Sequence, residues 1–351
     1  MLALLTGLWA GLARLGWDVP LPRPGFSSLH GPLMVSGFLG TLISLERAVA
    51  LGRPWAYATP LLTGLGGVSL IVGAPLLAAQ WLMLAGSLGL VAIFAAIIRR
   101  HPALYTFTMG GGSLVWALGN LLWCLGWPVF LVVFWWAAFL VVTIAGERLE
   151  LARLQQVTGA AQATLLLLLG ILLTGLLLLG WSFDGGVRLF GLGLAGLALW
   201  LGRHDIARRT VKQAGLTRFI AICLLTGYVW LGISGLSAMW FGGVPVGPQY
   251  DATLHAFFLG FVFAMIFAHA PIIFPAVLGA RMAYRPLFYA HVVLLQVTLV
   301  VRLIGDAAGW SAGRQVGGLL NAVTLLLFLV NTVSALQSPP ERAGTAQGRG
   351  A

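Results

Sequence analysis

Charged residues are scarce in this sequence: Asp, Glu, Lys and Arg make up 8% of its 351 residues, whereas apolar residues make up 60%. So few charges cannot cover a packed core with a wetted surface, which excludes a soluble globular protein. The apolar runs have the length of about 20 residues that a helix needs to cross a bilayer. The alternating segments of a membrane β-barrel, about ten residues each, are absent. The sequence therefore predicts an all-α, polytopic membrane helix bundle.

Cysteine and long polar segments are also nearly missing. Cys124 and Cys223 lie within apolar runs and lack the spacing of a disulfide or a metal site, so we interpret both as packing residues. The only sizeable polar loop is "RHDIARRTVKQAG", at residues 203–215. We therefore expect no soluble domain, but a single transmembrane domain at residues 1–337, followed by a disordered cytoplasmic tail at residues 338–351.

The apolar runs predict about twelve transmembrane helices. The first, "MLALLTGLWAGLARLGW", lacks the basic start and the small-residue cleavage site of a secretory signal, so we count it as a span. The expected spans are residues 1–17, 28–50, 56–76, 79–98, 104–124, 127–147, 161–181, 186–202, 217–241, 252–278, 285–308 and 315–336.

The basic residues predict the orientation of these spans, because Lys and Arg accumulate on the cytoplasmic side of a membrane. With the amino terminus inside, the outer set holds only Arg14, Arg23, Arg188, Arg302 and Arg314, and the inner set holds all other Lys and Arg residues. Both termini are then cytoplasmic. The net charge of +11 is explained by this topology, and no aromatic-interleaved basic domain suggests nucleic-acid binding.

The histidines fall at different depths in this topology. His30 lies just inside the second span and His255 at the same place in the tenth, and both spans run from outside to inside. An imidazole inside a bundle is costly and usually functional, although a structural hydrogen bond would also explain either ring alone. His101 and His204 lie in cytoplasmic loops beside arginines, where we expect solvated side chains.

Two further histidines lie in the inner half of the bundle. His269 follows His255 by fourteen residues, which is about 21 Å along a helix axis, so the two cannot bind one metal ion. His291 could lie near the depth of His269, and the pair leaves open a second, inner metal site. The alternative is two separate histidines hydrogen-bonded to backbone or water, since no carboxylate or thiol joins them.

Two imidazoles that face each other at one depth suit haem iron, and a porphyrin needs a slot with small and aromatic walls. Small and aromatic residues are present on the two helices in question, although both types are common in any membrane bundle. They are Gly31, Gly37 and Gly40 on the second helix, and Phe257, Phe258, Phe261 and Phe263 on the tenth.

Two motifs resemble the catalytic subunit of the haem-copper oxidases and nitric oxide reductases. "LHGPLMVSGFLGTLI" is similar to the second helix of that family, and "DATLHAFFLGFVFAMIFAHAPIIFP" is similar to its tenth. The resemblance implies a haem-copper-oxidase-like arrangement of helices, with His30 and His255 as the two axial ligands of a low-spin haem.

The sequence also departs from that family. Thr253 stands where the family has the histidine of its reactive haem, and the sixth and seventh spans contain no copper-binding histidine. What remains resembles the NnrS family of haem- and copper-containing membrane proteins linked to nitric oxide metabolism, through "LHAFFLG" and "AYRPLFYAHVVLLQVTLVVRL". This resemblance implies a b-type haem and a bacterial cytoplasmic membrane, and leaves the presence of copper open.

Charged residues inside the spans offer further candidates. Arg302 and Asp306 share one helix face near the depth of His30 and His255. By the resemblance to the haem-copper oxidases, Arg302 would hold a haem propionate; an internal Arg302–Asp306 ion pair is an equal alternative. Two acidic–basic pairs, Glu46–Arg47 and Glu147–Arg148, end the second and sixth spans, and we expect them to be interfacial anchors.

Three classes of function are compatible with these features. The first is a membrane haem protein that handles or senses nitric oxide, or passes an electron to a redox partner. The second is a gas-reducing haem or copper oxidoreductase, which would need an open coordination position or a second metal. The third is a polytopic transporter, for which we expect inverted repeats and broken helices. The histidine pair favours the first.

Overall fold

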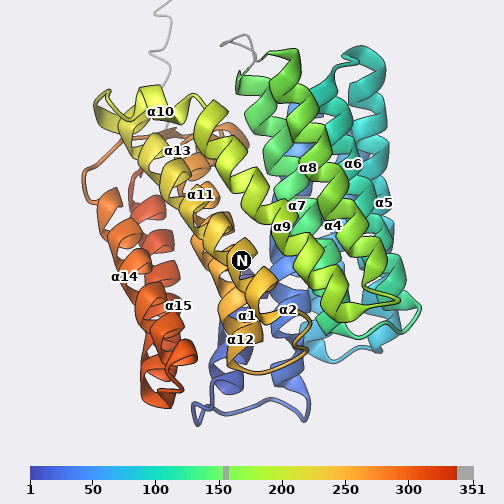
Figure 1. The fold of residues 1–351 in the computed structure, drawn as a ribbon, viewed down its shortest axis with the longest axis vertical. Coiled ribbons are helices and arrows are strands. Elements are labelled where there is room, and N and C mark those ends of the chain that lie inside the picture. The colour runs from blue at the N-terminus through green and yellow to red at the C-terminus, as the bar shows by residue number, and fades with distance from the viewer. Residues whose placement is uncertain (153–157, 338–351) are drawn as a thin grey trace, which may run out of the picture.

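The computed structural model describes residues 1–152 and 158–337, and these form an all-α bundle (Figure 1). The tail expected at residues 338–351 lies outside the described residues. The helices of the first half are α1 Leu2–Arg14, η1 Phe26–Leu29, α2 His30–Pro32, η2 Leu33–Gly40, α3 Thr41–Leu51, η3 Pro54–Tyr57, α4 Ala58–Val72, α5 Leu76–Arg100, α6 Leu104–Cys124 and α7 Val129–Ala152.

The second half of the chain is also helical apart from one short ladder. Its helices are α8 Gly159–Leu178, α9 Phe183–His204, α10 Ala207–Thr210, α11 Gly215–Phe241, α12 Pro248–His255, η5 Ala256–Val262, α13 Phe263–Leu278, α14 Phe288–Ala307 and α15 Ser311–Ser334. Strands β1 Arg281–Met282 and β2 Leu336–Gln337 pair antiparallel. This ladder ties the end of α15 to the loop after α13.

Ten continuous helical stretches in the described residues are long and apolar enough to cross a membrane, so the chain is a multi-pass membrane protein. Each of the expected spans coincides with a helix. Two of the expected spans are not among these ten stretches, each for its own reason. The first, α1, has 13 residues, which is short for a bilayer. The other, α6, has 21 residues, but the polar and glycine-rich run "TFTMGGGS" lowers its mean hydropathy.

Close packing between helices depends on small residues, as is usual where lipid provides no hydrophobic drive for association. Helix α9 packs against both α8 and α11. A Cβ atom at Gly235 of α11 would come within 2.5 Å of the Ala195 backbone nitrogen of α9, so only glycine permits this approach. In helix α7, 83% of the residues of its apolar membrane-spanning segment are buried inside the bundle.

Two of the membrane spans change helix type near one end of the bundle. After the 3-10 turn η1, His30 opens the three-residue α2, which passes directly into the π-helix η2. In the other span, His255 is the last residue of α12, and the π-helix η5 follows. Helices α2 and α12 lie near each other (Figure 1). Because π-helical segments are rare and concentrate at functional sites, the two π-helices indicate a functional site beside His30 and His255.

Candidate functional site

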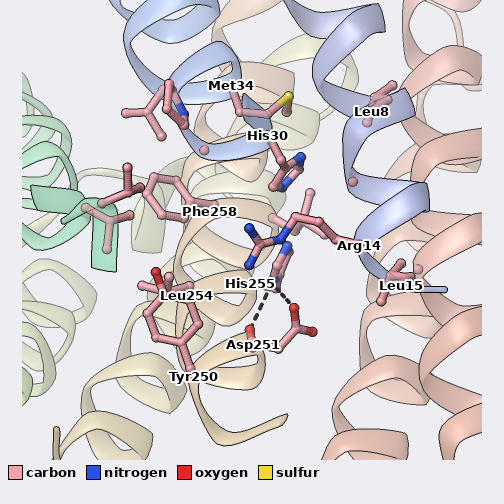
Figure 2. A pocket seen from close by; sticks show the side chains of 18 of the residues that line it. Leu8, Arg14, Leu15, His30, Met34, Tyr250, Asp251, Leu254, His255 and Phe258 are labelled. Carbon is pink, nitrogen blue, oxygen red and sulfur yellow. Dashed lines mark hydrogen bonds and ion pairs between the residues drawn. The ribbon is translucent and has the colours of Figure 1, made fainter. Parts of the chain in front are cut away.

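The structure brings His30 and His255 together. Their ring centres are 6.1 Å apart and their planes differ by 19°. The two side chains point toward one another from α2 and α12 (Figure 2). The equal depth expected from the sequence therefore becomes direct proximity in space.

Both rings use the same nitrogen to hold their orientation. His30 Nδ1 lies 2.8 Å from the carbonyl oxygen of Gly7 on α1. His255 Nδ1 lies 2.9 Å from the carbonyl oxygen of Asp251 and 3.2 Å from its carboxylate Oδ1. Since these acceptors require a proton on Nδ1, the Nε2 atom of each neutral ring keeps its lone pair, and within the described residues neither Nε2 has a hydrogen-bond partner. Metal-binding histidines are arranged in this way.

The separation of the rings fits one metal ion between them. Metal–nitrogen bonds of about 2.0 Å on both sides, with each ring centre about 1 Å behind its nitrogen, place two imidazole centres about 6 Å apart. The observed 6.1 Å is therefore compatible with two axial ligands of one ion. Direct stacking of the two rings would bring the centres closer than this.

A cavity of about 480 Å³ surrounds the two histidines. This volume is in the usual range for cofactor sites. Of the expected wall residues, Gly31, Phe258 and Phe263 line it. Gly37 and Gly40 do not: Gly37 packs against Ala3 and Gly67, and Gly40 makes room for Trp116. Outside the two spans that carry the histidines, the wall comes mainly from α1, α7 and α15, which the sequence did not connect to the site.

The charged side chains that line the cavity are mostly cationic. Arg14, Arg302 and Arg314 all line it, with Asp251 as the carboxylate among its lining residues. Arg302 donates from Nε and Nη2 to the two Asp251 oxygens, at 2.9 Å each. Within the described residues, neither Arg14 nor Arg314 has a carboxylate partner, and Arg314 Nε is buried without a hydrogen bond. Two guanidinium charges therefore remain for a negatively charged ligand.

The Arg302–Asp306 ion pair, one of the two alternatives for Arg302, is not formed. Asp306 is 6% exposed, and neither of its carboxylate oxygens has a hydrogen-bond partner in the described part of the chain. Arg302 points instead to Asp251, on a helix that lies far away in the sequence. The i, i+4 spacing on α14 made the local pair the natural expectation, and tertiary packing replaced it.

The two inner histidines have separate surroundings. His269 Nδ1 lies 2.6 Å from the Met265 carbonyl oxygen, and Arg148 Nη2 lies 3.0 Å from His269 Nε2. A metal ion at His269 would first have to displace Arg148, because both ring nitrogens are engaged. No group of three or more His, Cys, Asp or Glu suited to a metal occurs among the residues described. The inner metal site thus stays a prediction.

His291 is 2% exposed and lies among aromatic rings. Its ring centre is 4.7 Å from that of Phe267 and 5.3 Å from that of Phe328, and Asn331 Nδ2 lies 3.3 Å from its Nδ1. No ring contact joins it to His269 in the part of the chain that the structure describes. Its Nε2 atom is buried without a hydrogen-bond partner among the described residues, and a metal-binding role for His291 stays a prediction.

A buried ionic network lies toward the opposite end of the spans from His30 and His255, where the sequence suggested interfacial anchors. Arg148, 5% exposed, contacts His269 and lies 3.9 Å from Asp205, which also accepts a hydrogen bond of 2.7 Å from the Tyr228 hydroxyl. Glu147 pairs with Arg47 of α3. These residues link α3, α7, α11 and α13, so they join helices instead of facing the membrane surface.

The comparisons with known proteins give one match. A family described as Domain of unknown function (DUF8744) matches residues 1–337, and the chain therefore belongs to this family. No curated protein matches the sequence, and no solved structure matches the fold.

Proposed function

We propose that this chain is an integral membrane haem protein, with His30 and His255 as axial ligands of one b-type haem. The observation that carries the proposal is the pair of facing rings with free Nε2 atoms, 6.1 Å apart. Bis-imidazole coordination needs this separation and this pattern of hydrogen bonds. The cavity around the rings supplies space of the right order for a flat cofactor.

The charges of the cavity support a ligand that carries two carboxylates, as haem does. Arg302 is already neutralised by Asp251, so the propionate role that the sequence suggested for it passes in this proposal to Arg14 and Arg314. They come from α1 and α15, and both line the cavity. Guanidinium groups bind carboxylates in two-pronged hydrogen bonds, which suits this task.

The chain's own residues then perform three tasks. The histidines bind the iron, the arginines orient the macrocycle, and the apolar walls, including Phe258 and Phe263, exclude water. The bound haem would supply electron transfer and affinity for a small gas. This role, in nitric oxide or denitrification chemistry, and a kinship with the NnrS family are proposed from the sequence motifs. The same holds for a bacterial cytoplasmic membrane, a haem-copper-oxidase-like arrangement of twelve spans and cytoplasmic termini.

An absorption spectrum tests the proposal. The purified protein, reduced with dithionite, should show the sharp bands of six-coordinate, low-spin haem. His30→Ala and His255→Ala should each abolish that spectrum. His204→Ala is the matched control, because that ring lies beside Trp200, outside the residues that line the cavity. A colourless wild-type protein prepared from haem-replete cells would refute the proposal, and so would a normal six-coordinate spectrum in His255→Ala.

A further inference from the structure

The two histidines are held with different strength, and this difference suggests where a gas molecule can bind. Resting on the proposed haem site, we infer that His30 is the exchangeable ligand and that a small gas molecule binds on the His30 face. His255 stays in place because the Arg302–Asp251 pair holds it. Six-coordinate iron has no free position, so one of the two rings has to leave before a gas can bind.

The hydrogen-bond acceptors at Nδ1 differ in charge. His30 donates to a neutral backbone carbonyl, that of Gly7. His255 donates to the Asp251 carbonyl and lies 3.2 Å from the Asp251 carboxylate as well. A carboxylate acceptor raises the basicity of a ligating imidazole and fixes its orientation more firmly than a carbonyl does. His255 is therefore the stronger donor to the metal.

The Asp251 carboxylate is itself fixed. Arg302, with its side chain 6% exposed, binds both carboxylate oxygens at 2.9 Å. Direct contacts from Arg302 to Asp251 and from Asp251 to His255 therefore connect α14 to α12. Moving His255 would disturb a charge-assisted contact in a largely buried place, whereas moving His30 would break one neutral hydrogen bond.

The backbone and the surroundings of His30 also favour its movement. His30 lies between a 3-10 turn and a π-helix, on a three-residue α-helical segment. Its hydrogen-bond acceptor is on α1, the short helix at the end of the chain. The cavity near it is lined by Leu8 and Met34, and the flexible thioether of Met34 can adapt to a displaced ring. His255 also precedes a π-helix, but its contact with the Asp251 carboxylate holds it in place.

Single substitutions of the ligands form the first arm of the test. His30→Ala should keep haem as a five-coordinate species that binds carbon monoxide without delay. His255→Ala should lose most of its haem, because the remaining ligand is the weaker one. Haem content is measured after alkaline pyridine extraction, and carbon monoxide binding by difference spectra. Retention of haem in His255→Ala together with its loss in His30→Ala would overturn the inference.

The second arm leaves both histidines in place. Asp251→Asn should weaken haem retention about tenfold to a hundredfold, as is typical for partners of a metal ligand. It should also raise the reduction potential, because the carboxylate that stabilises oxidised iron is gone. Asp184→Asn, which removes an exposed carboxylate that pairs with Arg188 and does not line the cavity, is the matched control and should change neither value. Equal effects of the two substitutions would refute the role of Asp251.

The two proposals fail in different ways. A wild-type protein without haem would refute the proposed function and, with it, this inference. A wild-type protein with a normal bis-histidine spectrum, in which His30 and His255 prove equivalent in both arms, would refute only the inference.

Discussion

Gly11 controls the position of His30, and a single methyl group there tests the geometry of the site. A Cβ atom at Gly11 would lie 2.8 Å from His30 Nδ1 and 2.9 Å from Cε1. Carbon atoms in contact prefer about 3.5–4.0 Å, so the ring would have to move by about 1 Å. The hydrogen bond of 2.8 Å from His30 Nδ1 to Gly7 would then be lost.

The expected cost of Gly11→Ala follows from these contacts. Loss of a neutral hydrogen bond costs about 0.5–1.5 kcal/mol, and overpacking costs about 1–3 kcal/mol. The better helix propensity of alanine offsets about 1 kcal/mol. We expect the free energy of unfolding to fall by about 1–3 kcal/mol in total. The low-spin spectrum should weaken at the same time, since the Nε2 atom of His30 moves with the ring.

Gly170→Ala, in helix α8, is the control. A Cβ atom there would meet nothing within 4 Å, and Gly170 does not line the cavity. The stability of this variant should change by less than about 1 kcal/mol and its spectrum should not change. Denaturant titration in detergent micelles and an absorption spectrum measure both quantities. If Gly11→Ala were as stable as Gly170→Ala and kept the wild-type spectrum, the described position of His30 would be wrong.

Three further outcomes are expected. Arg148→Met should destabilise the protein by about 3–5 kcal/mol, because it leaves the buried Asp205 carboxylate without its cation. Adding Asp205→Asn should recover part of this loss in denaturant titrations, and strictly additive effects would contradict the coupling of Arg148 to Asp205. A reporter fused after Gln337 should be active only in the cytoplasm and one inserted at residues 242–247 only outside; the reverse would invert the topology. In stopped-flow spectra nitric oxide should perturb the reduced haem slowly and without multiple turnover, and His269→Ala should change neither result. Rapid turnover that needs His269 would indicate an inner metal site.

Local signals in the sequence were sufficient for the helices and for the histidine pair. Apolar runs give the positions of membrane spans, because each span has to satisfy its own backbone hydrogen bonds and therefore forms a helix whatever its neighbours are. Since His30 and His255 follow the starts of two spans that run the same way, counting residues was enough to place them at one depth. Their separation of 6.1 Å agrees with that count.

The partners of the charged residues could not be found in this way. Arg302 has Asp306 at the spacing of a helical ion pair, yet it binds Asp251 on α12. Arg14 and Arg314 come from opposite ends of the sequence and line one cavity. Nothing in the chain near Arg148 indicates that it reaches His269, 121 positions away.

The sequence by itself determined that this chain crosses a membrane many times and that two histidines lie at one depth in the bundle. Length, hydropathy and direction are properties of each helix alone. Only the tertiary structure decided which nitrogen of each ring is free, which arginine is neutralised, and where the π-helical turns η2 and η5 interrupt their spans. These features depend on contacts between helices that are remote in sequence, and the packing of their side chains selects one arrangement among several that local preferences allow.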